Sequence, residues 1–309
     1  MSKLSSPVLF LVFNRLETTK KVFSSIKKMR PAKLYISCDG PRNYIEGEST
    51  KVNIVREFIL NNIDWDCEVI TLFRDSNLGC KKAISTGIDW FFDNEEMGII
   101  LEDDCMPNED FYHYCEYALL KYKDCNDIFA VTGNNFQDGN TRGNASYYFS
   151  KHMHVWGWAS WRRAWKAYDV NIPFWKNFKK TQQWRDNNKT FYEKKYWELI
   201  IDKVSLNKID TWDYQWNLVI WKNNGMVVTP NKNLVTNIGF GCDATHTTSK
   251  ENKASMMKTG ELKSITDPSQ ITINTDADDY VFNNYLGGSD PLFLKTLILI
   301  IRIVLIKLK

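Results

Sequence analysis

Short apolar runs alternate with amphipathic stretches through the first part of the chain. The apolar runs predict buried strands at residues 8–13, 34–37, 69–72, 98–101 and 129–131. The stretches between them have apolar side chains at helical spacing, and they predict helices at residues 18–29, 51–61, 83–92 and 110–122. Strands that alternate with helices indicate right-handed crossovers and a mostly parallel sheet with helices on both faces. The pattern therefore predicts a Rossmann-like α/β fold.

From about His152 the pattern changes and tryptophan becomes frequent, so we expect this half to add helices and a few strands that wall a cleft. Residues from Thr247 to about Pro291 are polar and poorly periodic, which is typical of a lid or a linker. This stretch contains a second acidic cluster, Asp276, Asp278 and Asp279, which follows a strand-like run and is a weaker candidate for a metal site.

The last residues, from Leu292 to Lys309, are almost entirely Leu, Ile, Val and Phe. Lys295, Arg302 and Lys309 recur at every seventh position, so on a helix they lie close to one line. A spanning helix needs about 20 apolar residues without a central charge, and this segment is shorter. It is typical of an amphipathic helix in the membrane interface, attracted to anionic lipid. The alternative is a helix that packs on the protein's own core.

Composition narrows the possible functions. The 309 residues carry a formal net charge of only +3, which does not favour a nucleic-acid groove, so no nucleic-acid partner is expected. The 7 cysteines include no C-x-x-C pair, which argues against a zinc site or a disulfide framework and fits a reducing cytoplasm. Asn14 and Arg15 interrupt the first apolar run, so no signal peptide is predicted.

Candidate chemistry lies where the predicted strands end, because ligands of such sheets bind outside the carboxyl ends of the strands. The polar residues at these ends are Asn14 and Arg15, Asp39, the run from Arg74 to Asn77, and Glu102, Asp103 and Asp104. Adjacent carboxylates are hard oxygen ligands and suit Mg²⁺ or Mn²⁺ shared with phosphate oxygens. The alternative for this triplet is a solvated turn, but its position directly after a buried strand favours a metal-diphosphate site.

The other candidates each have a plain alternative. Arg15 could face a diphosphate or be a surface cation, and Asp39 could accept a hydrogen bond from a base N–H or initiate the Asp-Gly-Pro turn. Trp156 and Trp158 could stack on a sugar or pack in the core. His246 could reach the metal or the phosphates when a lid closes, or could have no role in the site.

Six motifs occur in order between residues 7 and 248, and together they are more specific than any one alone. They are VLFLVFNR from Val8, LYISCDG from Leu34, GIILEDDCMPNEDFYHY from Gly98, VWGWASW from Val155, TWDYQW from Thr211 and NIGFGCDATHT from Asn237. This set resembles N-acetylglucosaminyltransferase I and bacterial relatives from surface-polysaccharide gene clusters, which are nucleotide-diphospho-sugar transferases.

The resemblance implies a GT-A fold, a UDP-sugar donor and an inverting reaction. It assigns the diphosphate contact to Arg15 and the uracil contact to Asp39. It places Glu102 and Asp103 on the ribose and sugar, and it makes Asp104 the ligand of Mn²⁺ or Mg²⁺. Asn14 and Arg74 complete the expected nucleotide-sugar site.

The family's Trp-Asp-Asp-Trp stretch, which holds its general base, falls on residues 212–216 here. This sequence has one extra residue and a single acid there, so Asp213 is the expected base and Asp210 is its rival. Trp212 and Trp216 flank Asp213 and would desolvate it, which raises a carboxyl pKa toward a value useful in catalysis. Trp212 is also a candidate for stacking on the acceptor. The alternative is a helix N-cap aspartate among core tryptophans.

We therefore expect a nucleotide-sugar-binding half at residues 1–130, an acceptor-binding half at 131–248, a lid or linker at 249–290 and a membrane-associating helix at 291–309. The expected enzyme transfers a sugar to a glycan or lipid-linked acceptor in the synthesis of a surface polysaccharide such as lipopolysaccharide. It would be cytoplasmic and peripheral to the inner face of the membrane. The rival hypotheses are a sugar nucleotidyltransferase and a non-catalytic glycan-binding protein. The first usually has a Gly-rich loop after the first strand, and this sequence has none there.

Overall fold

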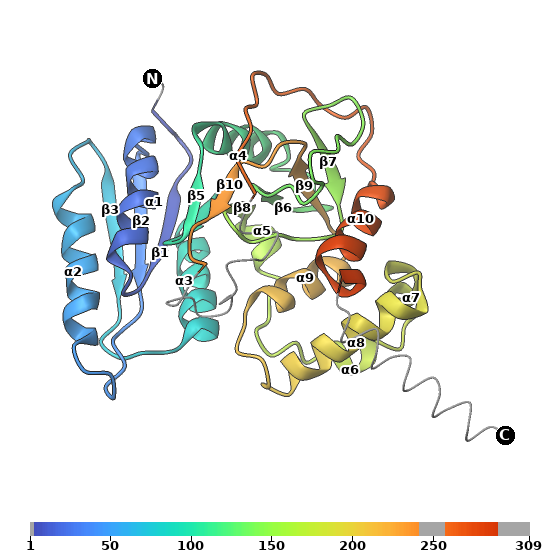
Figure 1. Ribbon diagram of the computed structural model, residues 1–309, viewed down its shortest axis with the longest axis horizontal. Coiled ribbons are helices and arrows are strands. Elements are labelled where there is room, and N and C mark those ends of the chain that lie inside the picture. Colours follow the sequence, from blue (N-terminus) through green and yellow to red (C-terminus); the bar gives the residue numbers. More distant parts are fainter. Residues whose placement is uncertain (1–2, 241–256, 290–309) are drawn as a thin grey trace.

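The computed structural model describes residues 3–240 and 257–289. Its centre is an eight-stranded sheet in the order β3-β2-β1-β4-β8-β6-β9-β7 (Figure 1). Strands β1, β2, β3 and β4 pair in parallel, and β6 pairs in parallel with β9. Strand β8 pairs antiparallel with both β4 and β6, and β7 pairs antiparallel with β9. The prediction of a mostly parallel α/β sheet is therefore confirmed.

The first half of the chain alternates strands and helices as expected. Its strands are β1 (Val8–Val12), β2 (Lys33–Cys38), β3 (Glu68–Phe73), β4 (Met97–Glu102), β5 (Cys105–Pro107) and β6 (Ile128–Thr132). Its helices are α1 (Leu16–Met29), α2 (Glu48–Asn61), α3 (Cys80–Asn94) and α4 (Glu109–Lys121). Nine predicted elements are thus confirmed within a few residues, while the short strand β5 was not predicted.

The second half contributes shorter elements. The strands are β7 (Tyr147–Ser150), β8 (Trp158–Trp161), β9 (Met226–Pro230) and β10 (Val235–Asn237). The helices are α5 (Arg162–Trp165), α6 (Trp175–Phe178), α7 (Gln182–Asn187), α8 (Phe191–Ser205), α9 (Asp213–Lys222), α10 (Thr275–Tyr285) and the 3₁₀ turn η2 (Gly287–Ser289). Strand β10 pairs with β5 in a second, two-stranded sheet.

Helices cover both faces of the large sheet because successive strand residues point to opposite sides. On one face, Val8 and Phe10 of β1 pack with apolar side chains of α1, α2 and α4. On the other face, Leu9 and Leu11 pack with α3, α5 and α9. A third core holds α6, α7 and α8 together, with Trp184 and Trp197 fully buried inside it. The tryptophan-rich half is therefore mainly a packed helical layer beside the sheet.

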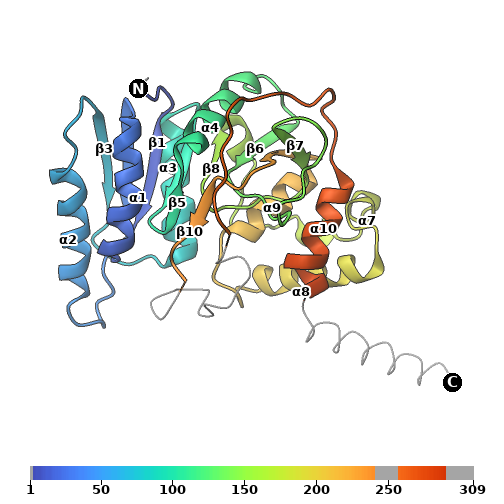
Figure 2. The same ribbon diagram turned by 45° about the horizontal axis from the view of Figure 1, so that its top comes forward.

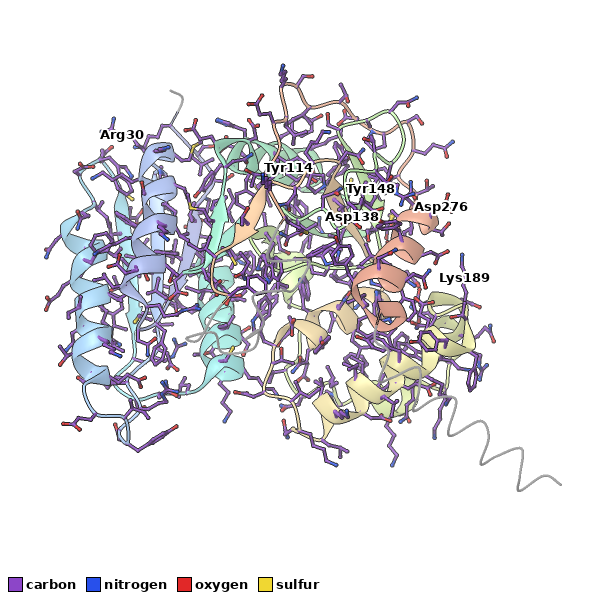
Figure 3. The ribbon with its side chains drawn as sticks, in the orientation of Figure 1. Arg30, Tyr114, Asp138, Tyr148, Lys189 and Asp276 are labelled. Carbon is purple, nitrogen blue, oxygen red and sulfur yellow. The ribbon has the colours of Figure 1, made fainter. Side chains whose placement is uncertain are left out.

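The predicted lid or linker at residues 249–290 is described only from residue 257 onward, and that part contains helix α10. Asp278 of α10 is buried, and it accepts hydrogen bonds from Ser150 Oγ at 2.5 Å and from the Lys151 N–H at 3.2 Å. Asp276 and Asp279 are exposed, and Figure 3 shows Asp276 at the outer edge of the molecule. The three acids therefore do not converge, and Asp278 fixes α10 to β7.

The predicted C-terminal helix at residues 291–309 lies outside the described residues. Within the part of the chain that the structure describes, no helix has both the length and the apolar character needed to cross a bilayer.

Asp278 gives a pH prediction for stability. Burial raises the pKa of its carboxyl from 3.8 to about 6. A carboxyl whose pKa is higher in the folded state stabilises the fold below its unfolded pKa, and this stabilisation is lost as pH rises through the folded pKa. We therefore expect the wild type to lose stability relative to Asp278→Asn between about pH 4 and pH 6. Urea unfolding of both proteins across this range measures the difference, and parallel curves would contradict the prediction.

Candidate functional site

The predicted site residues gather at one edge of the sheet because β1, β2 and β4 run parallel and end there (Figure 1). Arg15 lies between β1 and α1, Asp39 follows β2, and Glu102 is the last residue of β4. Asp103 and Asp104 occupy the turn between β4 and β5. The sheet thus places these four segments side by side at its carboxyl edge.

Arg15 binds both acids of the turn. Its Nη2 donates a hydrogen bond to Asp103 Oδ1 and another, at 2.9 Å, to Asp104 Oδ2. The Asp103 side chain is 4% exposed and the Asp104 side chain 16% exposed. The link from Val12 to Leu16 has only three residues, so Arg15 is held by both β1 and α1. One cation therefore joins the ends of two neighbouring strands, β1 and β4.

The local electrostatics favour a further positive charge. Burial raises the pKa of Asp103 to about 6, although Arg15 opposes this shift. Burial, with the charges of Asp104 and Asp103, raises the pKa of Glu102 well above its usual range. Burial opposes the charge of Arg15, but Asp103 and Asp104 raise its pKa overall. Three carboxyls thus share one guanidinium, and a bound cation would relieve their repulsion.

Two more acids lie near this triplet, Asp210 in the loop before α9 and Asp213 as the first residue of α9. Burial raises the pKa of the Cys80 thiol, and the charges of Glu102, Asp210, Asp213 and Asp104 raise it further. These carboxyls, from β4, its following turn and the start of α9, therefore lie around the first residue of α3. Asp213 also contributes to the raised pKa of Glu102. The structure thus brings Asp213 and Asp210 to the acidic triplet.

Asp213 is oriented more firmly than Asp210. Its Oδ1 accepts hydrogen bonds from Thr211 Oγ1 and, at 2.9 Å, from the Tyr214 N–H. Asp213 is half-buried, whereas Asp210 is exposed. A Cβ placed on Gly79 would lie 3.7 Å from Asp210 Oδ2, so Asp210 faces the N-terminus of α3. Thr211 was not predicted as a site residue, although its position two residues before Asp213 is a signal that could have been used.

Asp39 and Arg74 are held by internal hydrogen bonds. Asp39 accepts hydrogen bonds from the N–H groups of Gly40, Leu78 and Gly79 at 2.9 to 3.2 Å, so it fixes the loop that precedes α3. Arg74 donates to Ser37 Oγ and to Thr86 Oγ1. Only the Gly40 contact belongs to the Asp-Gly-Pro turn of the alternative interpretation, and the role of Asp39 with a nucleotide base stays a prediction.

Asn14 leads to a residue that sequence reasoning missed. Its Nδ2 donates a hydrogen bond of 2.9 Å to Glu48 Oε1, and Glu48 also forms an ion pair with Arg42. The guanidinium carbon of Arg42 lies 5.7 Å from the centre of the Phe13 ring. Glu48 is buried at the start of α2, so it ties the loop after β2 to the end of β1. No sequence pattern linked these remote positions.

Gly239 covers one side of Asp104. The Ile238 N–H donates a 2.7 Å hydrogen bond to the Asp104 carbonyl, and a Cβ on Gly239 would overlap the Asp104 carboxylate. Phe240, the next residue, lies against Trp156 with ring centres 5.7 Å apart. The chain after β10 therefore contacts the acidic triplet, and glycine is required there for steric reasons.

The three predicted stacking tryptophans differ in accessibility. Trp158 is fully buried and Trp212 is 3% exposed, and their rings stack on each other with centres 5.7 Å apart. Both therefore pack in the core, as the alternative interpretation had it. Trp156 is partly exposed and packs against Phe136. Of the three, it alone presents ring surface beside the site.

The expected metal ligands are only partly described. Asp104 is at the sheet edge, while His246 lies outside the described residues. Across residues 3–240 and 257–289, no three His, Cys, Asp or Glu side chains are arranged as a metal cage. The carboxylate oxygens of the triplet are nevertheless the donors that Mg²⁺ and Mn²⁺ prefer. Such ions are commonly held by one or two carboxylates together with substrate phosphates.

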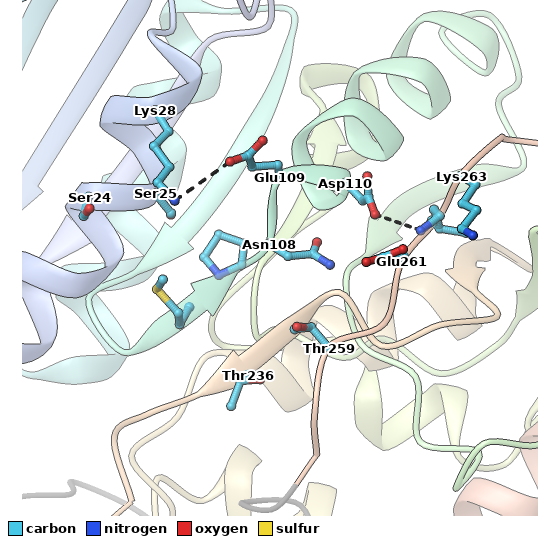
Figure 4. Close-up of a pocket in the computed structure, with 13 residues that line it drawn as sticks. Ser24, Ser25, Lys28, Asn108, Glu109, Asp110, Thr236, Thr259, Glu261 and Lys263 are labelled. Carbon is cyan, nitrogen blue, oxygen red and sulfur yellow. Dashed lines mark hydrogen bonds and ion pairs between the residues drawn. The ribbon is translucent and has the colours of Figure 1, made fainter. Parts of the chain in front are cut away.

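A separate cavity of about 590 Å³ lies between α1, the start of α4 and the β5–β10 sheet (Figure 4). None of the predicted site residues lines it. Several of its polar groups already bind one another, since Asn108 Nδ2 donates to the Gly260 carbonyl and Asp110 accepts from the Leu262 N–H. It is therefore distinct from the edge at which Arg15 meets the acids.

The sequence matches no protein-family model and no curated protein. Among solved structures it is similar to the mannosyltransferase PcManGT from Pyrobaculum calidifontis in complex with GDP-Man and Mn²⁺, with 14% identity, a TM-score of 0.35, and 50% of this chain and 44% of that chain covered. It is also similar to HddC from Yersinia pseudotuberculosis, with 12% identity, a TM-score of 0.32 and coverage of 56% and 86%. For HddC complexed with GMP-PN the values are 11%, 0.29, 47% and 60%.

The chain thus spans less than two thirds of the length of the mannosyltransferase and of the HddC complex. Likenesses at this level do not decide an activity, so the functional proposal rests on the geometry at the sheet edge.

Removal of Arg15 tests the electrostatic description of this edge. Arg15→Met leaves Asp103 buried without its cation, so we expect a loss of about 3 kcal/mol in the free energy of unfolding. Lys3→Met is the matched control because it removes the exposed Lys3–Asp66 pair, and it should cost less than about 1 kcal/mol. Urea unfolding measures the free energy of unfolding of both variants. Equal losses would show that the Arg15 ion pair contributes no more to stability than an exposed pair does.

Proposed function

We propose that the chain is a glycosyltransferase of the GT-A type that takes its sugar from a nucleotide diphosphate. The observation that carries this proposal is the meeting of Arg15, the triplet from Glu102 to Asp104 and the α9 acid Asp213 at one sheet edge. A nucleotide-sugar transfer needs a cationic group for the diphosphate and a carboxylate for the acceptor proton. Both kinds of group are present at this edge, with Arg15 bound to the turn acids and Asp213 close enough to raise the pKa of Glu102.

The donor side consists of Arg15 and the turn acids. Arg15 would donate hydrogen bonds to the diphosphate, and Glu102 and Asp103 would bind the ribose and sugar hydroxyls. Asp104 would hold Mn²⁺ or Mg²⁺, which would act as a Lewis acid that neutralises charge on the leaving diphosphate. Asn14, Asp39 and Arg74 would shape the nucleotide pocket, with uridine as the expected nucleoside. The excess of carboxyl groups over cations at this edge supports a bound divalent ion.

The acceptor side is Asp213. In an inverting transfer, the acceptor hydroxyl oxygen attacks C1 of the sugar as the bond from C1 to the diphosphate oxygen breaks. Asp213 would take the hydroxyl proton in that step. Its Oδ1 is engaged by Thr211 and by the Tyr214 N–H, which leaves Oδ2 to accept the proton. Trp156, from its place by Phe240, would contact the sugar or the acceptor.

The proposed acceptor class takes account of the C-terminal sequence. A glycan or lipid-linked acceptor in surface-polysaccharide synthesis would fit a cytoplasmic enzyme peripheral to the membrane. The apolar and basic segment at residues 291–309 would hold the protein beside such a lipid. Residues 1–130 would bind the donor and residues 131–248 the acceptor, with His246 and the 249–290 segment closing over both.

A sugar nucleotidyltransferase is the second enzyme hypothesis. Such enzymes usually have a glycine-rich loop after the first strand, whose backbone N–H groups surround a nucleoside triphosphate. Here α1 begins three residues after β1 ends, and the link contains no glycine. This link is too short for such a loop, so the structure favours the glycosyltransferase.

Calorimetry with UDP tests donor binding. We expect UDP to bind more tightly with Mn²⁺ present, because the cation joins the diphosphate to Asp104. Asp104→Ala should abolish this metal dependence. Its affinity for UDP in the presence of Mn²⁺ should be lower than that of the wild type by about tenfold or more. Asp279→Ala, an exposed acid on α10, is the control and should bind as the wild type does. Wild-type protein that binds glycans but shows no metal-dependent UDP binding would instead be a glycan-binding protein.

Substitution of the proposed base separates binding from turnover. Asp213→Asn should keep UDP affinity within about twofold and lower turnover by about 10²- to 10⁴-fold, because only the proton acceptor is lost. Asp210→Asn is the matched control and should retain most of the activity. The measurement is donor consumption with a nucleotide-sugar panel. A large loss for Asp210→Asn with full activity of Asp213→Asn would move the base to Asp210.

A further inference from the structure

Helix α8 has an apolar stripe on its outer face. Phe191, Leu199 and Leu206 are 56%, 41% and 64% exposed. Their spacing of eight and seven residues places them on one side of the helix, since two turns take about seven residues. The opposite side is buried in the third core through Trp197, Ile201 and Val204. The stripe is therefore not needed for the packing of α8, and it faces away from the protein.

The surroundings of this stripe are basic. Residues 173–210 contain nine Lys or Arg and five Asp or Glu, whereas the whole chain has a net charge of only +3. One of the five acids, Glu193, is buried and paired with Lys151. The exposed lysines of this region are Lys176, Lys180, Lys189, Lys203 and Lys208, and Figure 3 shows Lys189 at the outer edge near α8. Positive charge thus flanks exposed apolar side chains.

The described chain ends against the same helix. The Tyr192 hydroxyl of α8 donates a hydrogen bond to the Gly287 carbonyl of η2. A Cβ on Gly287 would overlap the ring of Tyr196, also on α8. Figure 2 shows α10 leading down to α8. The turn η2 therefore lies at the flank of α8, and the sequence that follows it, residues 290–309, is apolar with four Lys or Arg.

We propose that the outer face of α8 is a membrane-contacting surface that binds an anionic bilayer. This inference extends the proposed function, because it assigns a folded part of the enzyme to the lipid surface. Exposed apolar side chains would enter the headgroup region while the lysines contact anionic headgroups. A contact made by a folded helix would fix the orientation of the enzyme on the membrane and not only its location.

A second copy of the chain is a less suitable occupant of this face. A two-fold symmetric contact sets each patch against its own copy, so the lysines around α8 would face lysines. Like charges opposed in this way weaken association, whereas an anionic surface complements them. The charge around the stripe therefore favours lipid over self-association.

Vesicle sedimentation of the full-length protein tests the proposal. The variant Phe191→Ser/Leu199→Gln/Leu206→Gln removes the stripe. The matched control, Ile54→Gln/Leu60→Gln/Leu120→Gln, removes three side chains that are 43%, 43% and 53% exposed on α2 and α4. We expect the ratio of bound to free protein on phosphatidylglycerol–phosphatidylcholine vesicles to fall about tenfold or more for the α8 variant only. Pure phosphatidylcholine vesicles should bind the wild type more weakly than the mixed vesicles.

Three outcomes would overturn the proposal. The α8 variant could bind the mixed vesicles as the wild type does, which would leave all lipid contact to residues 290–309. The wild type could remain in the supernatant. Analytical ultracentrifugation could show a dimer that the α8 variant dissociates, which would make this face a contact between copies. Metal-dependent UDP binding, measured on the same variants, should be unchanged, so failure here is separable from failure of the proposed function.

Discussion

The structure at the sheet edge depends on one ionic contact, the guanidinium of Arg15 between the carboxylates of Asp103 and Asp104. Arg15 is held in a three-residue link, and the two acids occupy the turn after the neighbouring strand. The contact therefore joins β1 to β4 at the point where both end. Without a cation there, adjacent acids next to a buried strand would repel each other in a poorly solvated place.

The neighbouring acids Asp213 and Glu102 lie outside this ionic contact. Asp213 is oriented by Thr211 and by a backbone N–H, and no cation is among the groups that bind its Oδ1. Glu102 has a raised pKa because it is buried beside other carboxyls. An enzyme tolerates such an arrangement where a ligand supplies the missing charge, and strongly perturbed carboxyls are common at functional sites. A bound ligand that carries positive charge would therefore account for the grouping of these acids at one edge.

The sequence predicted the parts of the fold that depend on local pattern. The apolar runs that became β1 and β4 and the amphipathic stretch that became α1 are all visible without a structure. Strand ends then located Arg15 and the acidic triplet, because parallel strands end at one edge. The antiparallel insertion of β8 between β4 and β6 was not predictable, since pairing partners leave no mark in a four-residue strand.

Contacts between remote segments also escaped prediction. Glu48 and Gly239 touch the site through residues 34 and 135 positions away, and no periodicity encodes such contacts. Trp158 and Trp212 are the reverse case, because a tryptophan near a site is equally compatible with stacking on a ligand and with burial in the core. Only the three-dimensional packing separates the two.

The contact of Gly239 with Asp104 has a consequence for synthesis on the ribosome. The acidic turn leaves the exit tunnel early, but the chain that covers it follows more than a hundred residues later. The same is true of β10, whose partner β5 comes directly after the turn. The acidic turn of the nascent N-terminal half therefore stays uncovered until the segment that contains Gly239 has been synthesised.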